Sequence, residues 1–484
     1  MLPDSVWAVM FMLFVPGCQQ PDNPWKEKVP AAVERAERDH SVAAFREALD
    51  TTWRADDWQA GLKLAEQALK KKTLAQELQP RIIRALWRAG RLLQAEELAS
   101  DLPTPTDDRV ALRVLIEIHL ARGQLERALE LAAHLETLPT LTAEDLYHVF
   151  AARFTGDRLD GLADLLRRAE RLTDPRHGYP ETFVGEAIDG VAEFLSSVGN
   201  TPLNQIVQHG AAPMPPLVMF NLPSCDVLIN GRGPYRMVVD TGGSIMVALD
   251  QTVADEIGIK SIAKASVRGV AGKTESGQAL IDELQIGNIR CRRVLTRVFD
   301  VRAAIMNAAD GVIGTGVFGR ARLTLDFASG QLLLSPSTEA EPAGRPAELR
   351  LISDAKLIVP VKLQGQPALA LLDTGADAVA LSPTRLKLLF PDQELPSIRS
   401  GLALGVGSGE SPSVSLGPGV NLELAGRKFS NYGGLGLNVL DEVLSPALGV
   451  QLDILLGMPT FREMRSCTVD FARCRLWIDW LREE

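Results

Sequence analysis

The part of the chain that follows residue 216 contains two copies of one sequence pattern. Each copy has an apolar strand that ends in Asp-Thr-Gly, first at Asp240–Gly242 and again at Asp373–Gly375. In both copies a glycine-containing turn precedes this strand. An apolar run ending in glycine, a Thr-x-Asp-Phe segment and one more strand follow it in the same order. One Asp-Thr-Gly carries little information, whereas two in the same five-element order indicate a duplicated fold.

The spacing of these elements agrees between the two copies. Asp240 precedes Gly314 by 74 residues, and Asp373 precedes Gly457 by 84 residues. Short β-branched runs alternate with Gly and Pro turns throughout this part, which predicts an all-β structure. The expected segments are a first β lobe at 217–336, an inter-lobe linker at 337–350 and a second β lobe at 351–484.

The two aspartates are the candidate catalytic residues. An aspartate that directly follows apolar strand residues is carried into a site of low dielectric, where its charge is costly. Two such aspartates close together can share one proton and titrate as a unit. The ionised member can then take a proton from water while the protonated member donates a hydrogen bond to a carbonyl. If the two copies pair within one chain, Asp240 and Asp373 would face each other in this way.

The histidines and the net charge restrict the chemistry further. The chain has six histidines, and the last of them is His209. The duplicated part therefore cannot hold a Ser-His-Asp triad, a Cys-His pair or a metal site built on histidine. We expect neither a metal nor a cofactor. With a net charge of -10 the chain also lacks the basic footprint of a protein that binds nucleic acid.

These residues resemble the pepsin and retroviral protease superfamily, and most closely the retropepsin-like aspartyl proteases of bacteria. Asp-Thr-Gly-Ala-Asp at 373–377 is similar to the retroviral form, while Gly243 replaces the more usual Ala or Ser. The resemblance implies a double-lobed aspartic protease fold with both aspartates in one chain, as a monomeric pseudo-dimer. It also implies supporting roles for the catalytic loops (Thr241, Gly242, Thr374 and Gly375) and for two glycines that pack against them (Gly314 and Gly457).

Other features of the β part leave alternatives open. The resemblance implies substrate-covering flaps at Arg268–Thr274 and Leu404–Glu410, although both segments also suit ordinary hairpin turns. Ser244 and Asp377 follow the catalytic loops, where they either line the cleft or lie at the surface. The cysteines of this part either pair in one of three ways or stay free and buried. These cysteines are Cys225, Cys291, Cys467 and Cys474.

The first 200 residues are rich in Ala, Leu, Arg and Glu at helical spacing. A period of 33 to 34 residues suits a helix-turn-helix solenoid unit. The segment resembles tetratricopeptide repeats and is predicted over 26–199, followed by a Pro-rich linker at 200–216. Such an array either presents a surface to a protein partner or acts as a spacer. The residues that carry the period are Asp56, Gly90, Gly123 and Gly156.

The N-terminus resembles a bacterial lipoprotein signal. Residues 6–15 form an apolar run that is too short to span a bilayer but suits a signal peptide. The run ends at Val15-Pro16-Gly17-Cys18, where the resemblance implies lipidation of Cys18. We expect residues 1–25 to be a signal peptide and short tether, and the protein to be exported as a periplasmic or outer-membrane lipoprotein. Its only contact with a membrane would be this lipid anchor; the alternative is an ordinary N-terminus with one buried cysteine.

The leading hypothesis is an aspartic endopeptidase that hydrolyses peptide bonds of a peptide or protein substrate. The alternative is a non-catalytic binding protein that uses its helical repeats and keeps the β part as a degenerate scaffold. Both aspartates, both threonines and both glycines of the duplicated motif are intact, which favours the enzyme. Substrate preference and working pH depend on loop geometry and surroundings that the sequence does not specify.

Overall fold

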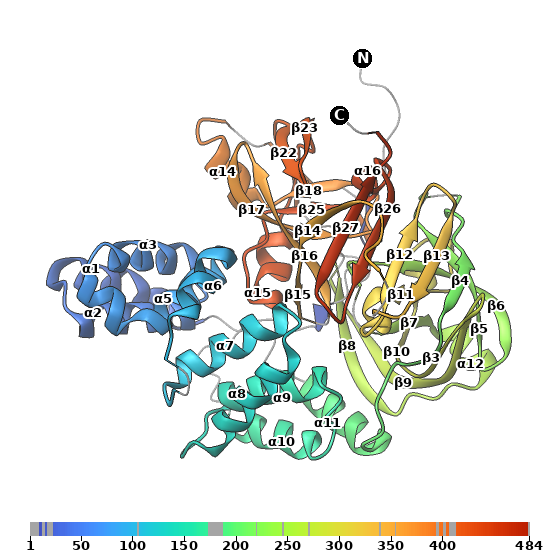
Figure 1. Cartoon of the computed structure of the whole chain (residues 1–484), viewed down its shortest axis with the longest axis horizontal. Coiled ribbons are helices and arrows are strands. Elements are labelled where there is room, and N and C mark those ends of the chain that lie inside the picture. Colours follow the sequence, from blue (N-terminus) through green and yellow to red (C-terminus); the bar gives the residue numbers. More distant parts are fainter. Residues whose placement is uncertain are drawn as a thin grey trace. The chain divides into compact units, whose positions relative to one another are not determined.

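The computed structural model describes the chain in segments, and after two short N-terminal strands it places helices before strands (Figure 1). This order confirms the predicted fold class, a helical part followed by an all-β part. Contacts divide the chain into a β unit, Thr201–Leu444 with Leu452–Glu484 and Met1–Gly17, and a helical unit, Cys18–Asn200 with Ser445–Gln451. The described residues are 9–11, 15–16, 23–103, 106–172, 187–218, 220–243, 246–269, 272–337, 340–353, 355–393, 396–399, 403–405 and 413–482.

The helical unit is built from antiparallel helix hairpins: α2 with α3, α5 with α6, α7 with α8, and α9 with α10. Side chains at the helix starts satisfy free backbone N–H groups, as when Thr142 and Asp145 form a capping box on α9. The helices are η1 (Lys26–Lys28), α1 (Val29–Asp39), α2 (Val42–Arg54), α3 (Trp58–Leu69), α4 (Lys72–Glu77), α5 (Gln79–Arg88), α6 (Leu92–Ser100), α7 (Arg109–Ala121), α8 (Leu125–Thr137), α9 (Ala143–Thr155), α10 (Leu162–Leu172), α11 (Ala187–Val198) and α15 (Ser445–Leu448).

The residues that carry the sequence period lie at the turns of these hairpins. Asp56, Gly90 and Gly123 have positive φ angles of 55°, 75° and 68°, the left-handed conformation that reverses the chain between two helices. The fourth hairpin differs, because Gly156 ends α9 with φ at −82° and the next residue, Asp157, has φ at 52°. The repeat is therefore shifted by one residue in its last copy, where the turn is also longer.

Replacing Gly61 with alanine should stabilise the α2–α3 hairpin by up to about 1 kcal/mol, the cost of glycine within a helix. A Cβ atom at Gly61 would lie 3.4 Å from Thr52 Oγ1, which is ordinary van der Waals contact. The corresponding positions of the next two hairpins are already alanines, Ala95 and Ala128, and both are buried. Hydrogen exchange of peptides from α2 and α3 should slow in the variant. Faster exchange would mean that the two helices cross too closely for a methyl group.

Lobe 1 of the β unit is a closed barrel of six strands in the order β9, β5, β6, β11, β7 and β10, closed by pairing of β10 with β9. Asn230 and Gly231, between β5 and β6, both have positive φ, as a two-residue type I′ hairpin turn requires. The elements of this lobe are β3 (Gln205–Gln208), β5 (Ser224–Ile229), β6 (Arg232–Asp240), β7 (Val247–Asp250), α12 (Gln251–Ile257), β8 (Ala263–Gly269), β9 (Gly272–Ile286), β10 (Ile289–Phe299), α13 (Val301–Ala304), β11 (Gly311–Gly314) and η4 (Thr315–Phe318).

Lobe 2 repeats this arrangement as an open sheet in the order β19, β21, β24, β18, β25, β17, β16, β22 and β23. Gln364 and Gly365 form the equivalent turn, again with two positive φ angles. The elements are β15 (Arg350–Ile352), β16 (Lys356–Leu363), β17 (Gln366–Leu372), β18 (Val379–Leu381), α14 (Pro383–Leu389), β19 (Ser397–Arg399), β20 (Ala403–Gly405), β21 (Ser413–Leu416), β22 (Val420–Leu424), β23 (Arg427–Tyr432), β24 (Leu435–Leu437), η5 (Leu440–Leu444), β25 (Ile454–Leu456) and α16 (Met458–Phe461).

A six-stranded sheet joins the two lobes in the order β14, β27, β26, β12, β13 and β4. Its central strands pair antiparallel, so that Thr324 lies opposite Thr468 with the hydroxyl oxygens 2.9 Å apart. From one edge to the centre the strands are β4, β13 and β12, and from the other edge they are their counterparts β14, β27 and β26. This correspondence gives the β unit an approximate two-fold axis. The strands are β4 (Gly210–Pro213), β12 (Arg322–Asp326), β13 (Gln331–Ser335), β14 (Arg345–Glu348), β26 (Met464–Asp470) and β27 (Arg475–Trp480).

Both segments predicted as linkers contain strands of the β unit, which corrects that expectation. Within 200–216, β3 pairs with β10 and β4 pairs with β13. Within 337–350, β14 pairs with β27. Proline suggested linkers here, but β4 and β14 are edge strands, where a missing N–H breaks no interior ladder. The predicted linkers therefore supply the outer strands of the sheet that joins the lobes.

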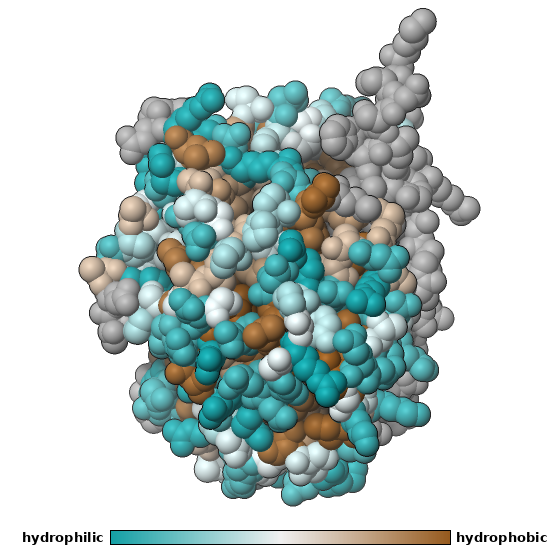
Figure 2. All heavy atoms as spheres, turned by 90° about the vertical axis from the view of Figure 1, so that its right-hand side faces the viewer, coloured by the Kyte–Doolittle hydropathy of each residue, from teal (hydrophilic) through white to brown (hydrophobic). Residues whose placement is uncertain are grey.

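One hydrophobic core runs through the β unit and includes residues of both lobes, from Ala212 to Trp480. The four cysteines of this unit are buried thiols that take part in no disulfide among the described residues, and Cys467 lies opposite Ile478 rather than Cys474. On the face shown in Figure 2, brown residues are scattered in small groups between teal ones. That mixture is ordinary for a protein surface, since apolar atoms contribute much of it.

Two short strands of the N-terminal segment belong to the β unit. β1 (Val9–Phe11) pairs with β20, and β2 (Val15–Pro16) pairs with β8. Cys18, the residue expected to carry a lipid, lies outside the described residues. Among the helices that are described, none has both the length and the apolar character needed to cross a bilayer.

Candidate active site

The duplicated strands bring Asp240 and Asp373 together at the interface of the lobes. Asp240 is the last residue of β6, and Asp373 directly follows β17. Each of these strands pairs in parallel with the apolar strand of its own lobe, β6 with β11 and β17 with β25. Both aspartates have an exposed fraction of 0%. The sequence pattern and the buried site therefore correspond residue by residue.

Two threonines tie the catalytic loops to each other across the interface. Thr241 N–H donates to Thr374 Oγ1 over 3.0 Å, and Thr374 N–H donates to Thr241 Oγ1 over 2.9 Å. The same hydroxyls donate onward to backbone carbonyls of the opposite lobe, Thr241 to Leu372 at 2.9 Å and Thr374 to Val239 at 2.8 Å. Four buried hydrogen bonds thus fix the position of one loop relative to the other.

Two glycines allow each loop to approach the aspartate of the opposite lobe. A Cβ atom on Gly242 would lie 2.4 Å from Asp373 Cγ, and one on Gly375 would lie 2.7 Å from Asp240 Cγ. No side chain fits at those distances. Each glycine also donates its N–H to the aspartate of its own loop, with both bonds at 2.8 Å to an Oδ1 atom. Each carboxyl group is therefore held by one lobe and packed against the other.

Burial raises the pKa of both carboxyl groups. For Asp240 the pKa rises to about 6, although hydrogen bonds from Asp373, Gly242 and Gly243 oppose the effect of burial. For Asp373 the pKa lies well above its ordinary value, because burial and then the charge of Asp240 both disfavour its ionised form. Within the described part of the chain, neither Oδ2 atom has another hydrogen-bond donor. Two such groups titrate as a pair, and they share one proton in the pH range between the two ionisation steps.

Comparison with protein families identifies the lobes. The model of the aspartyl protease family matches residues 225–321 and, a second time, residues 359–460. The β unit is a tandem pair of aspartyl protease domains. Each match contains one catalytic loop and the apolar strand that supports it. A search of curated proteins found no match to this chain.

Gly314 and Gly457 lie against the catalytic loops of the two aspartyl protease domains. A Cβ atom on Gly243 would come within 2.9 Å of Gly314 Cα, and one on Gly457 would come within 2.6 Å of Ala376 O. Both contacts are closer than real Cβ atoms allow, so positions 243 and 457 require glycine. The third loop residue, Gly243, therefore leaves no room for the Ala or Ser that more often follows Asp-Thr-Gly.

Two further aspartates support the protease domains in a way that the sequence analysis did not predict. Asp310 accepts a hydrogen bond from Arg236 N–H at 2.8 Å, and Asp453 accepts one from Leu369 N–H at 2.9 Å. Arg236 and Leu369 occupy equivalent positions in the two catalytic strands. The duplicated Asp at the start of each glycine-ending run was the available signal. Asp310 and Asp453 thus each bond to the strand that ends in the Asp-Thr-Gly motif of its lobe.

Part of the predicted cleft lies outside the described residues. In lobe 1, β8 and β9 form the hairpin expected as a flap, but residues 270–271 at its tip are not described. In lobe 2, the expected flap continues beyond β20 into 406–412, which are also not described. Ser244 also lies outside the described residues, whereas Asp377 is described and half-buried. These positions stay predictions.

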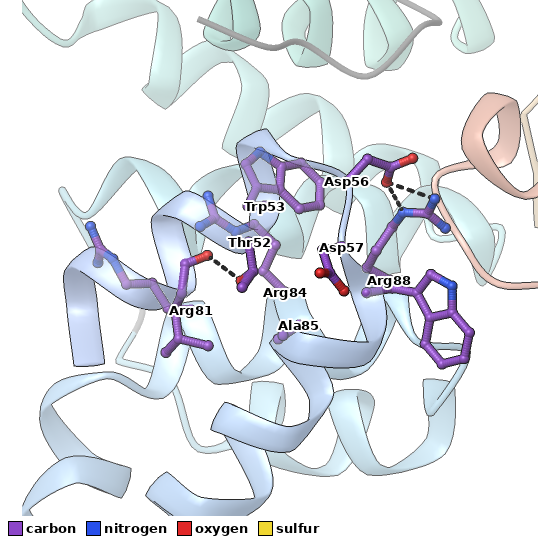
Figure 3. A pocket seen from close by; sticks show the side chains of 11 residues that line it. Thr52, Trp53, Asp56, Asp57, Arg81, Arg84, Ala85 and Arg88 are labelled. Carbon is purple, nitrogen blue, oxygen red and sulfur yellow. Dashed lines mark hydrogen bonds and ion pairs between the residues drawn. The ribbon is translucent and has the colours of Figure 1, made fainter. Parts of the chain in front are cut away.

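The helical unit has a small hollow between α2, α3 and α5. Figure 3 shows Trp53 and three arginines of α5 at this hollow, with Arg88 joined to Asp56. Arg81 and Arg84 likewise pair with Asp50 at 3.0 and 2.7 Å. Each of these arginines has a carboxylate partner within the unit. The hollow is therefore a joint between two helix hairpins, and its chemistry selects no particular ligand.

Proposed function

We propose that this protein is an aspartic endopeptidase in which Asp240 and Asp373, one from each aspartyl protease domain, activate a water molecule between them. One observation carries this proposal: the two buried carboxyl groups have raised pKa values and are held across the lobe interface by a symmetric set of hydrogen bonds. A decayed scaffold would have no reason to keep two carboxyl groups buried next to each other in its interior.

The proposed reaction uses the single proton of the pair. The ionised carboxylate takes a proton from water as the water oxygen attacks the carbonyl carbon of the peptide bond. The protonated carboxyl group donates its proton to the carbonyl oxygen, which gives a neutral tetrahedral diol. When the C–N bond breaks, the proton taken from water passes to the amine and the other returns to its carboxyl group. The pair ends the cycle with one proton, as it began.

The helical unit has a separate place in this proposal. Its hairpins form a repeat array, and arrays of this kind present a continuous surface to partners. We propose that the array either selects the protein substrate or acts as a spacer between the peptidase and an N-terminal lipid anchor. Removing the helical unit would separate these roles, since only selection would change which proteins are cleaved.

The test of the peptidase proposal is cleavage of a peptide library by the full chain across acid and neutral pH, with products identified by mass spectrometry. We expect cleavage in the mildly acid range, where the pair holds one proton, and loss of cleavage above the pH at which that proton leaves. A statine-type inhibitor, whose hydroxyl group imitates the attacking water, should bind one per chain and abolish cleavage.

The same experiment addresses the alternative, a binding protein that is not an enzyme. Peptides that bind the full chain but are recovered uncut at every pH, with or without the inhibitor, would favour that function. Inhibitor binding without any cleavage would place the peptide in the cleft and contradict only the chemical step.

A further inference from the structure

The two lobes differ at one position beside the dyad. In lobe 2, β16 pairs with β17 so that Ile358 lies opposite Leu371. Continuing this register by two residues places Lys356, the first residue of β16, opposite Asp373. Side chains two residues apart on a strand lie on the same face. A lysine therefore lies on the strand next to one catalytic aspartate, in the position from which cross-strand pairs interact.

The equivalent position in lobe 1 carries no charge. There β5 pairs with β6 so that Ser224 lies opposite Val238, and Val239 N–H donates to Pro223 O at 2.8 Å. The next residue, Leu222, is thus the counterpart of Lys356 and lies opposite Asp240. Leu222 has an exposed fraction of 0%. The duplication therefore places an apolar side chain beside one aspartate and an ammonium group beside the other.

Lys356 is among the largest fully buried side chains of the protein, with an exposed fraction of 2%. A buried ammonium group is costly unless negative charge lies nearby. Its charge acts on both members of the dyad and favours the ionised form of each, against the effect of burial. The two carboxyl groups can therefore supply the negative charge that a buried lysine requires.

Two other charged residues near β16 that the structure describes, Arg350 and Lys362, have partners of their own. Arg350 of the neighbouring strand β15 donates to Leu349 O and pairs with Glu348 at 3.3 Å. At the far end of β16, Lys362 is exposed and pairs with Glu423 of β22 at 3.2 Å. The charge of Lys356 acts on the ionisation of Asp373 after β17 and of Asp240 in lobe 1, both of them described residues.

We propose that Lys356 is a positioning residue whose buried positive charge keeps the dyad singly ionised at lower pH than burial alone would allow. The inference rests on the proposed peptidase function, because it concerns the ionisation state that such a reaction needs. Burial by itself favours a pair with both carboxyl groups protonated, which has no base for the attacking water. A fixed positive charge offsets that preference and extends activity toward acid pH.

The experiment compares the full-length wild type with Lys356→Met and Lys356→Gln, which lack the charge, and Lys356→Arg, which keeps it. With ¹³Cγ-labelled aspartate, the dyad carboxyl signals should titrate about one pH unit higher in both neutral variants, and near the wild-type pH with arginine. The acid limb of the pH profile of kcat/KM should move by the same amount. Lys362→Met, on the exposed end of the same strand, should change neither.

The outcomes separate this inference from the proposed function. A shifted carboxyl titration without any peptidase activity would refute the peptidase and leave the role of Lys356 intact. Unshifted titration in folded neutral variants would overturn that role. If the neutral variants do not fold, the ¹³Cε signal of Lys356 is followed in an Asp240→Asn/Asp373→Asn protein. The lysine should lose its proton at lower pH there, because coupling is reciprocal, and an unchanged titration would again overturn the proposal.

Discussion

Replacing Asp240 or Asp373 with asparagine should lower kcat/KM for peptide hydrolysis by about 10³-fold or more in either variant. Asparagine keeps the size of the side chain and can still accept the N–H of Gly242 or Gly375. It cannot take a proton from water, so the pair loses its base or its shared proton. Because the two carboxyl groups act as one unit, the double variant should be no less active than the weaker single variant.

The matched control is Asp282→Asn, which makes the same chemical change on the exposed face of β9. This variant should cleave the chosen peptide at the wild-type rate across the pH range. Full activity in either dyad variant would show that one carboxyl group suffices, and the shared-proton mechanism would then be wrong.

The dyad variants should also be more stable than the wild type at neutral pH. Burial raises the pKa of Asp240 from 3.8 to about 6 and that of Asp373 well above 3.8. A carboxyl group with a raised pKa stabilises the folded state fully below its unfolded pKa, and this contribution is lost as the pH rises through the folded value. Urea unfolding below pH 3.8 and above pH 6 should therefore show that asparagine gains stability relative to aspartate as pH rises. Asp282→Asn should show no such gain.

The duplicated pattern was sufficient to predict the dyad and the order of the fold. An Asp-Thr-Gly at the end of an apolar strand has little freedom, because the strand fixes its direction and the glycine fixes the approach of the opposite loop. The second Asp-Thr-Gly motif, at 373–375, supplied the loop that lies opposite the first. Asp240, Asp373 and their threonines could therefore be placed together from local sequence alone.

Features that depend on strand register could not be predicted in the same way. Lys356 begins an apolar run, where a charged residue ordinarily marks the exposed end of a strand, and only the pairing of β16 with β17 places it opposite Asp373. The proline-rich segments were interpreted as linkers because proline disfavours interior strands, but the edges of the joining sheet tolerate it. Asp157 replaces Gly156 at the last helical turn through a shift of one residue that the period of 33 does not reveal.

Replacing Thr241 or Thr374 with valine should destabilise the β unit by about 2–5 kcal/mol. Valine has nearly the same shape, so the loss comes from hydrogen bonds and not from a cavity. Without the Thr241 hydroxyl, the buried N–H of Thr374 has no acceptor and Leu372 O loses its donor. Serine keeps the hydroxyl group and should lose far less stability at either position.

The measurements are urea unfolding and, separately, hydrogen exchange of peptides from the two Asp-Thr-Gly loops. Both are made in a dyad variant that cannot digest itself, and again in an Asp282→Asn protein for comparison. The matched control is Thr468→Val in the joining sheet. It removes the contact between the Thr324 and Thr468 hydroxyls and leaves the hydroxyl of Thr324, which is half-buried and can be hydrated instead. That variant should lose no more than about 1 kcal/mol.

The symmetry of these hydrogen bonds also predicts that the two valine variants lose similar amounts of stability. Thr241 and Thr374 each receive one N–H and each donate to one carbonyl of the opposite lobe, with distances that agree within each kind of bond. Valine at either position should therefore cost about the same stability, although one lobe is a closed barrel and the other an open sheet. The contrary outcome is that one valine variant unfolds at the wild-type urea concentration while the other is destabilised. The loops would then be held by one lobe alone, and the positions of the carboxyl groups would not depend on the reciprocal hydrogen bonds between Thr241 and Thr374.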